Sequence, residues 1–128
     1  MRERLLFSSA LASAMIAGLT LAGPAFACSC GPKPDPGAYR GQASVIVEGE
    51  VVGLKSPPLG QPGMTRATIR VGAVTKGRAG RVITVSTRSQ PEACGFRFTR
   101  GQSREFLLRR QGGSFVTDAC LMIGARRP

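Results

Sequence analysis

The chain has 128 residues, a formal net charge of +11, four cysteines, and no histidine or tryptophan. This length suits one domain with a thin core. Without histidine the commonest general base is missing, and no paired-carboxylate, P-loop or nucleophile-elbow pattern is visible. We therefore expect the protein not to be an enzyme, to have no catalytic residues and to use no cofactor.

Residues 1–27 have the layout of a signal peptide. A positively charged start precedes an apolar stretch from Leu5 to Leu21. Ala25-Phe26-Ala27 then forms the small-x-small pattern after which signal peptidase cleaves. We expect export, removal of residues 1–27, and a secreted or periplasmic protein that begins at Cys28.

Two other outcomes are open for this N-terminal segment. Retention as a membrane anchor is disfavoured, because the apolar stretch is short and interrupted by serine, glycine and threonine. Lipidation of Cys28 is disfavoured, because lipoprotein signals carry Leu and a small residue at the positions that Ala25 and Phe26 occupy.

All four cysteines lie beyond the expected cleavage site, at Cys28, Cys30, Cys94 and Cys120. An even number of cysteines in a short exported domain indicates disulfides. A bond between Cys28 and Cys30 would be strained, which leaves two possible pairings. A metal or redox site built on Cys-x-Cys is the alternative, and it is less favoured because the chain lacks histidine and a second close cysteine pair.

The segment from Gly31 to Gly37 contains three prolines and cannot form a helix or a central strand. Proline holds the chain near an extended shape, so we expect a stiff, exposed ridge directly after Cys30. Asp35 followed by Pro36 predicts a short capped helical turn that reaches Tyr39.

Five later segments have the pattern of strands, and turns rich in glycine or proline separate most of them. They are residues 43–54, 65–76, 81–87, 105–110 and 114–121. In the first strand Gly49 and Gly53 predict a bend or bulge. The residues expected to share one face of this strand are Val45, Val47, Gly49 and Val51. Those expected to point inward from the second strand are Ala67, Ile69, Val71 and Ala73.

Five strands without a long helix predict an all-β domain that covers residues 28–128. The count fits a five-stranded Greek-key barrel of the OB type, stapled by two disulfides, and also fits a small sandwich. We expect the barrel. No internal repeat or second domain is visible in the sequence.

The basic charge is spread along the chain. Residues 1–27 hold two arginines and one glutamate, so residues 28–128 carry a net charge of +10. Binding to a polyanionic surface is one interpretation. A soluble cationic surface is favoured over it, because the arginines are scattered and stacking aromatics are few. We expect no specific nucleic-acid partner and a monomer.

Several short motifs follow one another in an informative order. They are Cys28-Ser29-Cys30 at the cleavage site, Gly31-Pro32-Lys33-Pro34, a valine-rich strand from Ala43, a strand ending in Lys76-Gly77, Cys94-Gly95-Phe96, and Thr117 to Cys120. In this order the motifs resemble the N-terminal, netrin-like domain of the tissue inhibitors of metalloproteinases. The resemblance extends over residues 28–121.

The resemblance implies a netrin-like barrel with the disulfides Cys28–Cys94 and Cys30–Cys120. It implies a partner, a zinc metalloendopeptidase, whose catalytic zinc the N-terminal amine and carbonyl of Cys28 chelate. The further residues that it places in contact with the protease are Ser29, Cys30, Gly31, Pro32, Glu92 and Ala93. It implies no metal of the chain's own.

The chain also departs from the eukaryotic members of that family. They carry a third disulfide and a second domain, and the loop at residues 56–63 is short here. The chain is thus similar to a short, bacterial-type member. Two other functions are open: a non-inhibitory basic OB-fold binding module for polyanions or an acidic protein, and an envelope structural or assembly factor.

Overall fold

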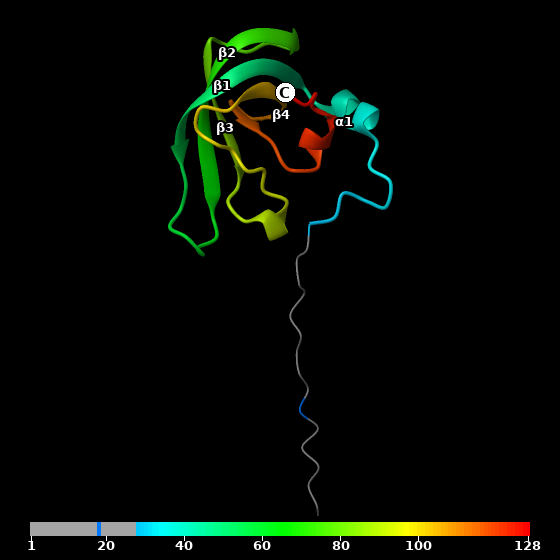
Figure 1. The fold of residues 1–128 in the computed structure, drawn as a ribbon, viewed down its shortest axis with the longest axis vertical. Helices are drawn as coiled ribbons and strands as arrows, with labels where there is room; N and C mark the ends of the chain where they lie inside the picture. The colour runs from blue at the N-terminus through cyan, green and yellow to red at the C-terminus, as the bar shows by residue number, and fades with distance from the viewer. Residues whose placement is uncertain (1–17, 19–27) are drawn as a thin grey trace, which may run out of the picture.

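The computed structural model describes Gly18 and residues 28–128, and Figure 1 shows the latter as a β-barrel with one short α-helix beside it. The expected signal peptide, residues 1–27, lies outside the described residues except for Gly18. None of the helices in the described part is long and apolar enough to cross a membrane.

The described chain forms one α-helix, five strands and two 3-10 helices. In chain order they are α1 (Pro36–Gln42), β1 (Val45–Lys55), β2 (Met64–Lys76), β3 (Val82–Arg88), η1 (Pro91–Ala93), β4 (Ser103–Gln111), β5 (Ser114–Val116) and η2 (Leu121–Gly124). The Asp35 carboxylate accepts from the Gly37 amide at 2.9 Å and caps α1 as expected. The helix continues for three residues beyond Tyr39.

The strands close into a barrel in the order β1-β2-β3-β5-β4, with β4 returning beside β1. Every pair is antiparallel except β3 with β5, which run parallel. A parallel pair needs a long connection, and residues 89–113, with η1 and β4, supply it. The expected five-stranded, OB-like barrel is confirmed, and a two-sheet sandwich is not what forms.

β1 bends at the two glycines that predicted a bulge. Its pairing with β2 shifts register between Glu48 and Gly49, and again between Val51 and Gly53. A Cβ atom on Gly49 would lie 2.6 Å from the carbonyl oxygen of Arg70, so this close approach of the strands needs glycine. The bend lets β1 pair with β2 on one side and β4 on the other, which closes the barrel.

The barrel interior is aliphatic and has one aromatic cluster. The side chains with no exposed surface include Val45, Val47, Val51, Ala67, Ile69, Val85, Phe106 and Leu108. Phe96 and Phe98 pack against Phe106, with ring centroids 6.5 and 5.7 Å away. The residues between η1 and β4 are therefore tied to the core.

The inward face of β2 ends earlier than its sequence predicts. Ala67 and Ile69 are buried, but Val71 is only half-buried and Ala73 is exposed, so the expectation for Ala73 is wrong. The last β2 residue that pairs with β3 is Arg70. Beyond Arg70, β2 pairs only with β1 and extends past the barrel. Every second side chain along this part of the strand is therefore no longer buried.

The fifth strand is also shorter than its apolar content predicts, because β5 ends at Val116. The Thr117 hydroxyl donates to the Leu107 carbonyl at 2.7 Å, and the Asp118 carboxylate accepts from the Leu121 amide at 2.7 Å. Side chains that bond to backbone in this way compete with a strand ladder. They turn the chain into η2, which buries Leu121 and Met122 and contacts β4.

Glu105 is the one buried carboxylate of the described chain. From β4 it pairs with Arg40 of α1 and accepts from the Arg126 amide at 2.9 Å. Arg40 also donates to the Gly124 carbonyl at 3.0 Å. Burial raises the pKa of Glu105, but the hydrogen bonds and charges of Arg40 and Arg126 outweigh it and hold that pKa below its ordinary value. The ionised carboxylate joins α1, β4 and the C-terminal residues.

We expect Glu105→Gln to lower the free energy of unfolding by about 2 kcal/mol at neutral pH, because the partly exposed Arg40 loses its charged hydrogen-bond partner. The folded-state pKa is depressed, so this stabilisation is complete above the unfolded-state pKa of about 4.3 and is lost as the pH falls through the lower folded-state value. Thermal melts of the two proteins, followed by circular dichroism, should converge as the pH is lowered. Glu48→Gln, at an exposed position of β1, is the matched control. A difference in melting temperature that persists unchanged in acid, or an equal loss of stability in Glu48→Gln, would contradict this role of Glu105.

Candidate functional site

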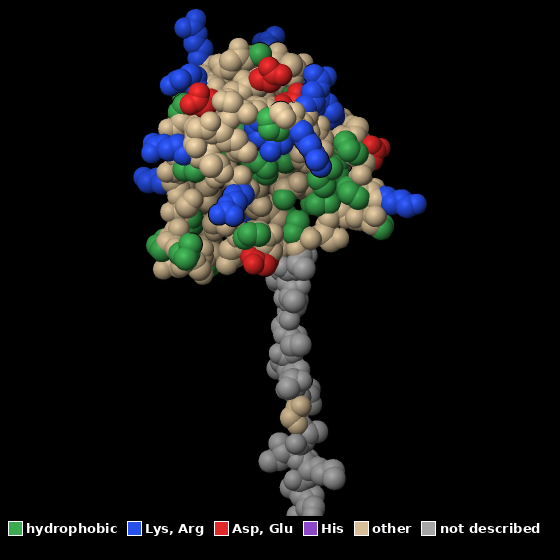
Figure 2. Space-filling model, in the orientation of Figure 1, with side chains coloured by type: hydrophobic (Ala, Val, Ile, Leu, Met, Phe, Trp, Pro, Cys, Tyr) green, Lys and Arg blue, Asp and Glu red, His purple; other side chains and the backbone are tan. Residues whose placement is uncertain are grey.

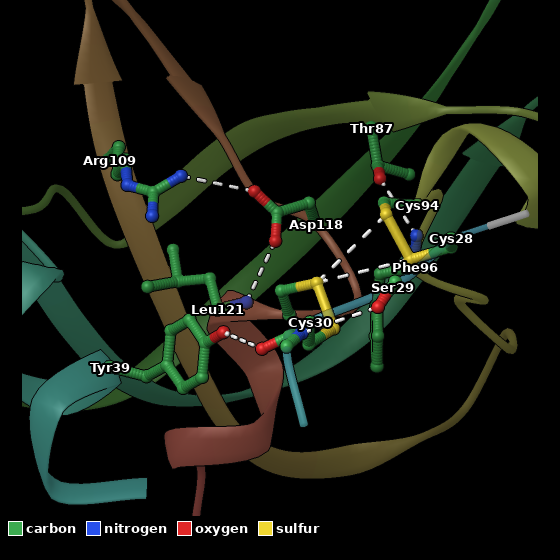
Figure 3. The surroundings of a disulfide bond; sticks show 12 residues. Cys28, Ser29, Cys30, Tyr39, Thr87, Cys94, Phe96, Arg109, Asp118 and Leu121 are labelled. Atoms are coloured by element: carbon green, nitrogen blue, oxygen red, sulfur yellow. Dashed lines mark hydrogen bonds and ion pairs between the residues drawn. A yellow bond between two sulfur atoms is a disulfide. The ribbon is translucent and has the colours of Figure 1, made fainter. Parts of the chain in front are cut away.

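Two disulfides tie the start of the folded region to two distant points of the chain. Cys28 bonds to Cys94 and Cys30 bonds to Cys120, over sequence separations of 66 and 90. The pairing implied by the resemblance is thus confirmed, and no cysteine of the described chain is free. Figure 3 shows the two bonds side by side. Ser29, between the first two cysteines, has a covalently anchored neighbour on each side.

A tight backbone turn presents Cys94 to this segment. Cys94 directly follows η1, and its φ of 61° is the only left-handed value among the described non-glycine residues. Its amide donates to the Pro91 carbonyl at 3.0 Å. At the next residue, Gly95, a Cβ atom would lie 2.1 Å from the Arg88 carbonyl oxygen. The turn therefore requires glycine directly after the cysteine.

Cys120 sits in the turn between β5 and η2. Asp118 accepts from η2 through one carboxylate oxygen and from Arg109, at 3.0 Å, through the other. The amide of Ala119 donates to the Cys94 carbonyl at 2.8 Å. This hydrogen bond joins the two disulfide-bearing turns directly, so all four cysteines share one end of the barrel.

The segment after the disulfides is exposed, as expected, but it is not extended throughout. Ser29, Gly31 and Pro32 are exposed, while Gly31 has a φ of 91° and the chain bends at the next two residues. The Tyr39 hydroxyl donates to the Cys30 carbonyl at 3.0 Å. Since this bond and the Cys30 disulfide fix the end of the segment, the bend carries the chain away from η1 and toward α1 (Figure 1).

The predicted contact residues fall into two groups. Glu92 and Ala93 are exposed on η1, directly before Cys94, and thus lie at the same end as Cys28 and Ser29. Gly31 and Pro32 belong to the stretch beyond the Cys30 anchor that leads to α1. The structure gathers the first group around the Cys28–Cys94 disulfide and sets the second group apart from it.

A groove of about 560 Å³ borders η1 on its other side. The loop between β1 and β2 forms one wall, and residues 89–92 and 95–98 form the opposite wall. Leu59, at the tip of that loop, is fully exposed. Glu92 thus lies between the disulfide cluster and an open, partly apolar groove.

Sequence analysis missed the side chains that position this site. Tyr39 holds the Cys30 carbonyl, Asp118 shapes the turn of Cys120, and Thr87 accepts from the Phe96 amide at 2.9 Å just after Cys94. Asp118 could have been found, because an Asp three residues before an apolar run is a helix-start pattern. The other two contacts each join residues nine positions apart, a spacing that has no local sequence pattern.

No model of a known protein family and no curated protein matches this chain. The site itself presents main-chain groups and the Ser29 hydroxyl on a tethered, protruding segment, flanked by the exposed residues of η1. Such a surface is suited to contact with another macromolecule.

We expect removal of both disulfides to cost about 1 kcal/mol more than the sum of the two single removals. Once either disulfide has formed, the loop that the other disulfide closes consists only of residues 28–30 and 94–120. The longer of these two segments spans a sequence separation of 26. Loop entropy then gives about 3.5 kcal/mol for removing one bond and about 8 kcal/mol for removing both. Chemical denaturation of the two Cys→Ala pair variants and of the four-alanine variant measures this. Losses that simply add would contradict the shared loop.

Proposed function

We propose that this chain, once cleaved so that it begins at Cys28, inhibits a zinc metalloendopeptidase in the periplasm or outside the cell. The observation that carries the proposal is the exposed Ser29 held between two cysteines, each bonded to a different turn of the barrel. A protruding segment that is rigid before binding loses little conformational entropy on association. This property suits insertion into a protease cleft.

The chemistry of the new N-terminus would supply the main contact. A catalytic zinc has three protein ligands and one open position that water normally occupies. The α-amine and carbonyl of Cys28 can form a five-membered chelate ring on that position. The amine must be unprotonated to bind, and its ordinary pKa near 8 leaves a substantial neutral fraction that the metal favours further. An amide bond from a preceding residue removes this ligand.

The residues around Cys28 would make the remaining contacts. Ser29 is exposed next to the chelating residue, with its hydroxyl accepting from the Gly31 amide at 3.4 Å, and would enter the adjoining substrate pocket. Glu92 and Ala93, exposed on η1, would contact the rim of the same cleft. Gly31 and Pro32 would follow the cleft on the other side of the Cys30 anchor.

We expect a single alanine added before Cys28 to weaken inhibition by roughly 30–1000-fold, the effect of losing a central contact worth about 2–4 kcal/mol. The measurement compares inhibition constants of the two forms against a panel of zinc metalloendopeptidases, after N-terminal sequencing confirms each start. Both forms keep the two disulfides, so their melting temperatures should agree. A serine protease in the panel is the negative control.

Equal inhibition by both forms would rule out chelation by Cys28. Failure of the form that begins at Cys28 to inhibit any member of a broad panel, with its disulfides intact, would count against the inhibitor function altogether. Retention of residues 1–27 or lipidation of Cys28 in the exported protein would remove the free amine and with it the mechanism.

One observation favours a second candidate function, binding to polyanions. Residues 28–128 contain sixteen of the eighteen basic residues, and within the described chain only Arg40 and Arg109 form ion pairs with carboxylates. Figure 2 shows lysine and arginine side chains protruding over the visible face. The other cationic groups are available to acidic glycans or an acidic protein.

Retention on a sulfated-polysaccharide column separates the two functions. A polyanion-binding module should be retained at low salt and released steeply as salt rises, because each contact releases counter-ions. An alanine added before Cys28 should leave that elution unchanged. Weak retention at low salt would argue against the second function without affecting the first.

A further inference from the structure

The sulfur atoms of the two disulfides touch each other. Cys120 Sγ lies 3.9 Å from Cys28 Sγ and 3.9 Å from Cys94 Sγ. The sulfurs of Cys28, Cys30 and Cys120 all lie within 4.8 Å of one another. Figure 3 shows these contacts as dashed lines between the two bonds. All four sulfurs therefore converge on one small region.

This spacing is close to that of a tetrahedral metal site. A zinc ion binds thiolate sulfur at about 2.3 Å, so the sulfurs of a four-cysteine site are about 3.8 Å apart. Two contacts between the disulfides, from Cys120 Sγ to Cys28 Sγ and to Cys94 Sγ, already have this length. The two bonded pairs must separate by a little under 2 Å each on the same tetrahedral standard, and the Cys30 sulfur must adjust as well.

We propose that, when both disulfides are reduced, the thiolates of Cys28, Cys30, Cys94 and Cys120 bind one Zn²⁺ ion as a structural four-cysteine site. The ion would then join the same four points of the chain that the disulfides join in the oxidised protein. The inference concerns the reduced chain alone and does not depend on the proposed inhibition of a protease.

The chemistry balances with a dithiol as the reductant. Each protein disulfide accepts two electrons and two protons, and each dithiol leaves as its own disulfide. The four protein thiols then release four protons on binding Zn²⁺, which gives a centre with a net charge of −2. Zinc itself undergoes no redox change.

The four cysteines are accessible and have cationic side chains nearby. All four residues are half-buried, so they are accessible to a reductant and to an ion. Arg88 and Arg109 line the same hollow as Cys94 and Cys120. Their positive charges would offset part of the negative charge of the centre, although Arg109 is also paired with Asp118.

Contacts independent of the disulfides would keep the sulfurs together after reduction. The Ala119 amide bonds to the Cys94 carbonyl at 2.8 Å, and the Tyr39 hydroxyl bonds to the Cys30 carbonyl at 3.0 Å. Three of the four ligands would therefore start from positions that the barrel and α1 maintain. Cys28 is two residues from Cys30 and stays within reach.

The test uses the purified protein, reduced with excess dithiol and then freed of it under anaerobic conditions. We expect one Zn²⁺ per chain by metal analysis and, with Co²⁺ as a probe, the absorption of a tetrahedral tetrathiolate site. Zn²⁺ should raise the melting temperature of the reduced protein while its circular dichroism keeps the barrel signature. The oxidised protein is the matched control and should bind no metal at this site.

Cys30→Ser removes one ligand and one disulfide. In the reduced state its zinc affinity should fall by more than the roughly 10–100-fold typical of losing an outer-shell partner, and the tetrathiolate absorption should disappear. An alanine added before Cys28, which should weaken the proposed inhibition, should leave zinc binding unchanged. Failure of the two proposals is therefore distinguishable.

Three outcomes would overturn the inference. They are a folded reduced protein that binds no zinc, metal binding only by an unfolded chain with no rise in melting temperature, and equal binding by the oxidised protein. If Cys30→Ser does not fold, the comparison of reduced with oxidised wild-type protein still decides the question.

Discussion

The site depends on the contact between the Cys28–Cys94 and Cys30–Cys120 disulfides. The two bonds start only two residues apart and end on turns that are hydrogen-bonded to each other. They therefore act together as one double cross-link. Ser29 is held between them and exposed. A chain with a thin core thereby gains a rigid protrusion without devoting a strand or helix to it.

The barrel topology brings the two receiving turns together. The parallel pairing of β3 with β5 sends the intervening chain through η1 and β4, so Cys94 follows β3 and Cys120 follows β5 at one end of adjacent strands. Phe96 anchors the first turn to the core, and Asp118 shapes the second. On the other side of the segment, the Arg40–Glu105 pair holds α1 against β4.

The oxidation state of the four sulfurs separates the two roles that we propose. In the oxidised protein the disulfides make the N-terminal segment stiff enough to enter a protease cleft as a preformed unit. In the reduced protein the same sulfurs would hold zinc, which would join the same four points of the chain. Both roles follow from the convergence of four half-buried cysteines beside Arg88 and Arg109.

Local pattern in the sequence was sufficient for the strands, the cap of α1 and the barrel class. Val45, Val47 and Val51 alternate on a buried face, Gly49 and Gly53 mark real register shifts, and Asp35 caps where expected. These features depend on neighbours within a few residues, which sequence periodicity records. The four cysteines likewise indicated two disulfides, although spacing alone left two pairings open.

Only the tertiary structure decided the features that depend on contacts between different segments of the fold. It ended β5 at Val116 and left Ala73 exposed, because bonds to Leu107 and the lack of a second neighbouring strand override local pattern. It bent the proline segment at Gly31 and brought the Tyr39 hydroxyl to the Cys30 carbonyl. It also set the two disulfides 3.9 Å apart, since sequence separations of 66 and 90 contain no information about where two turns meet.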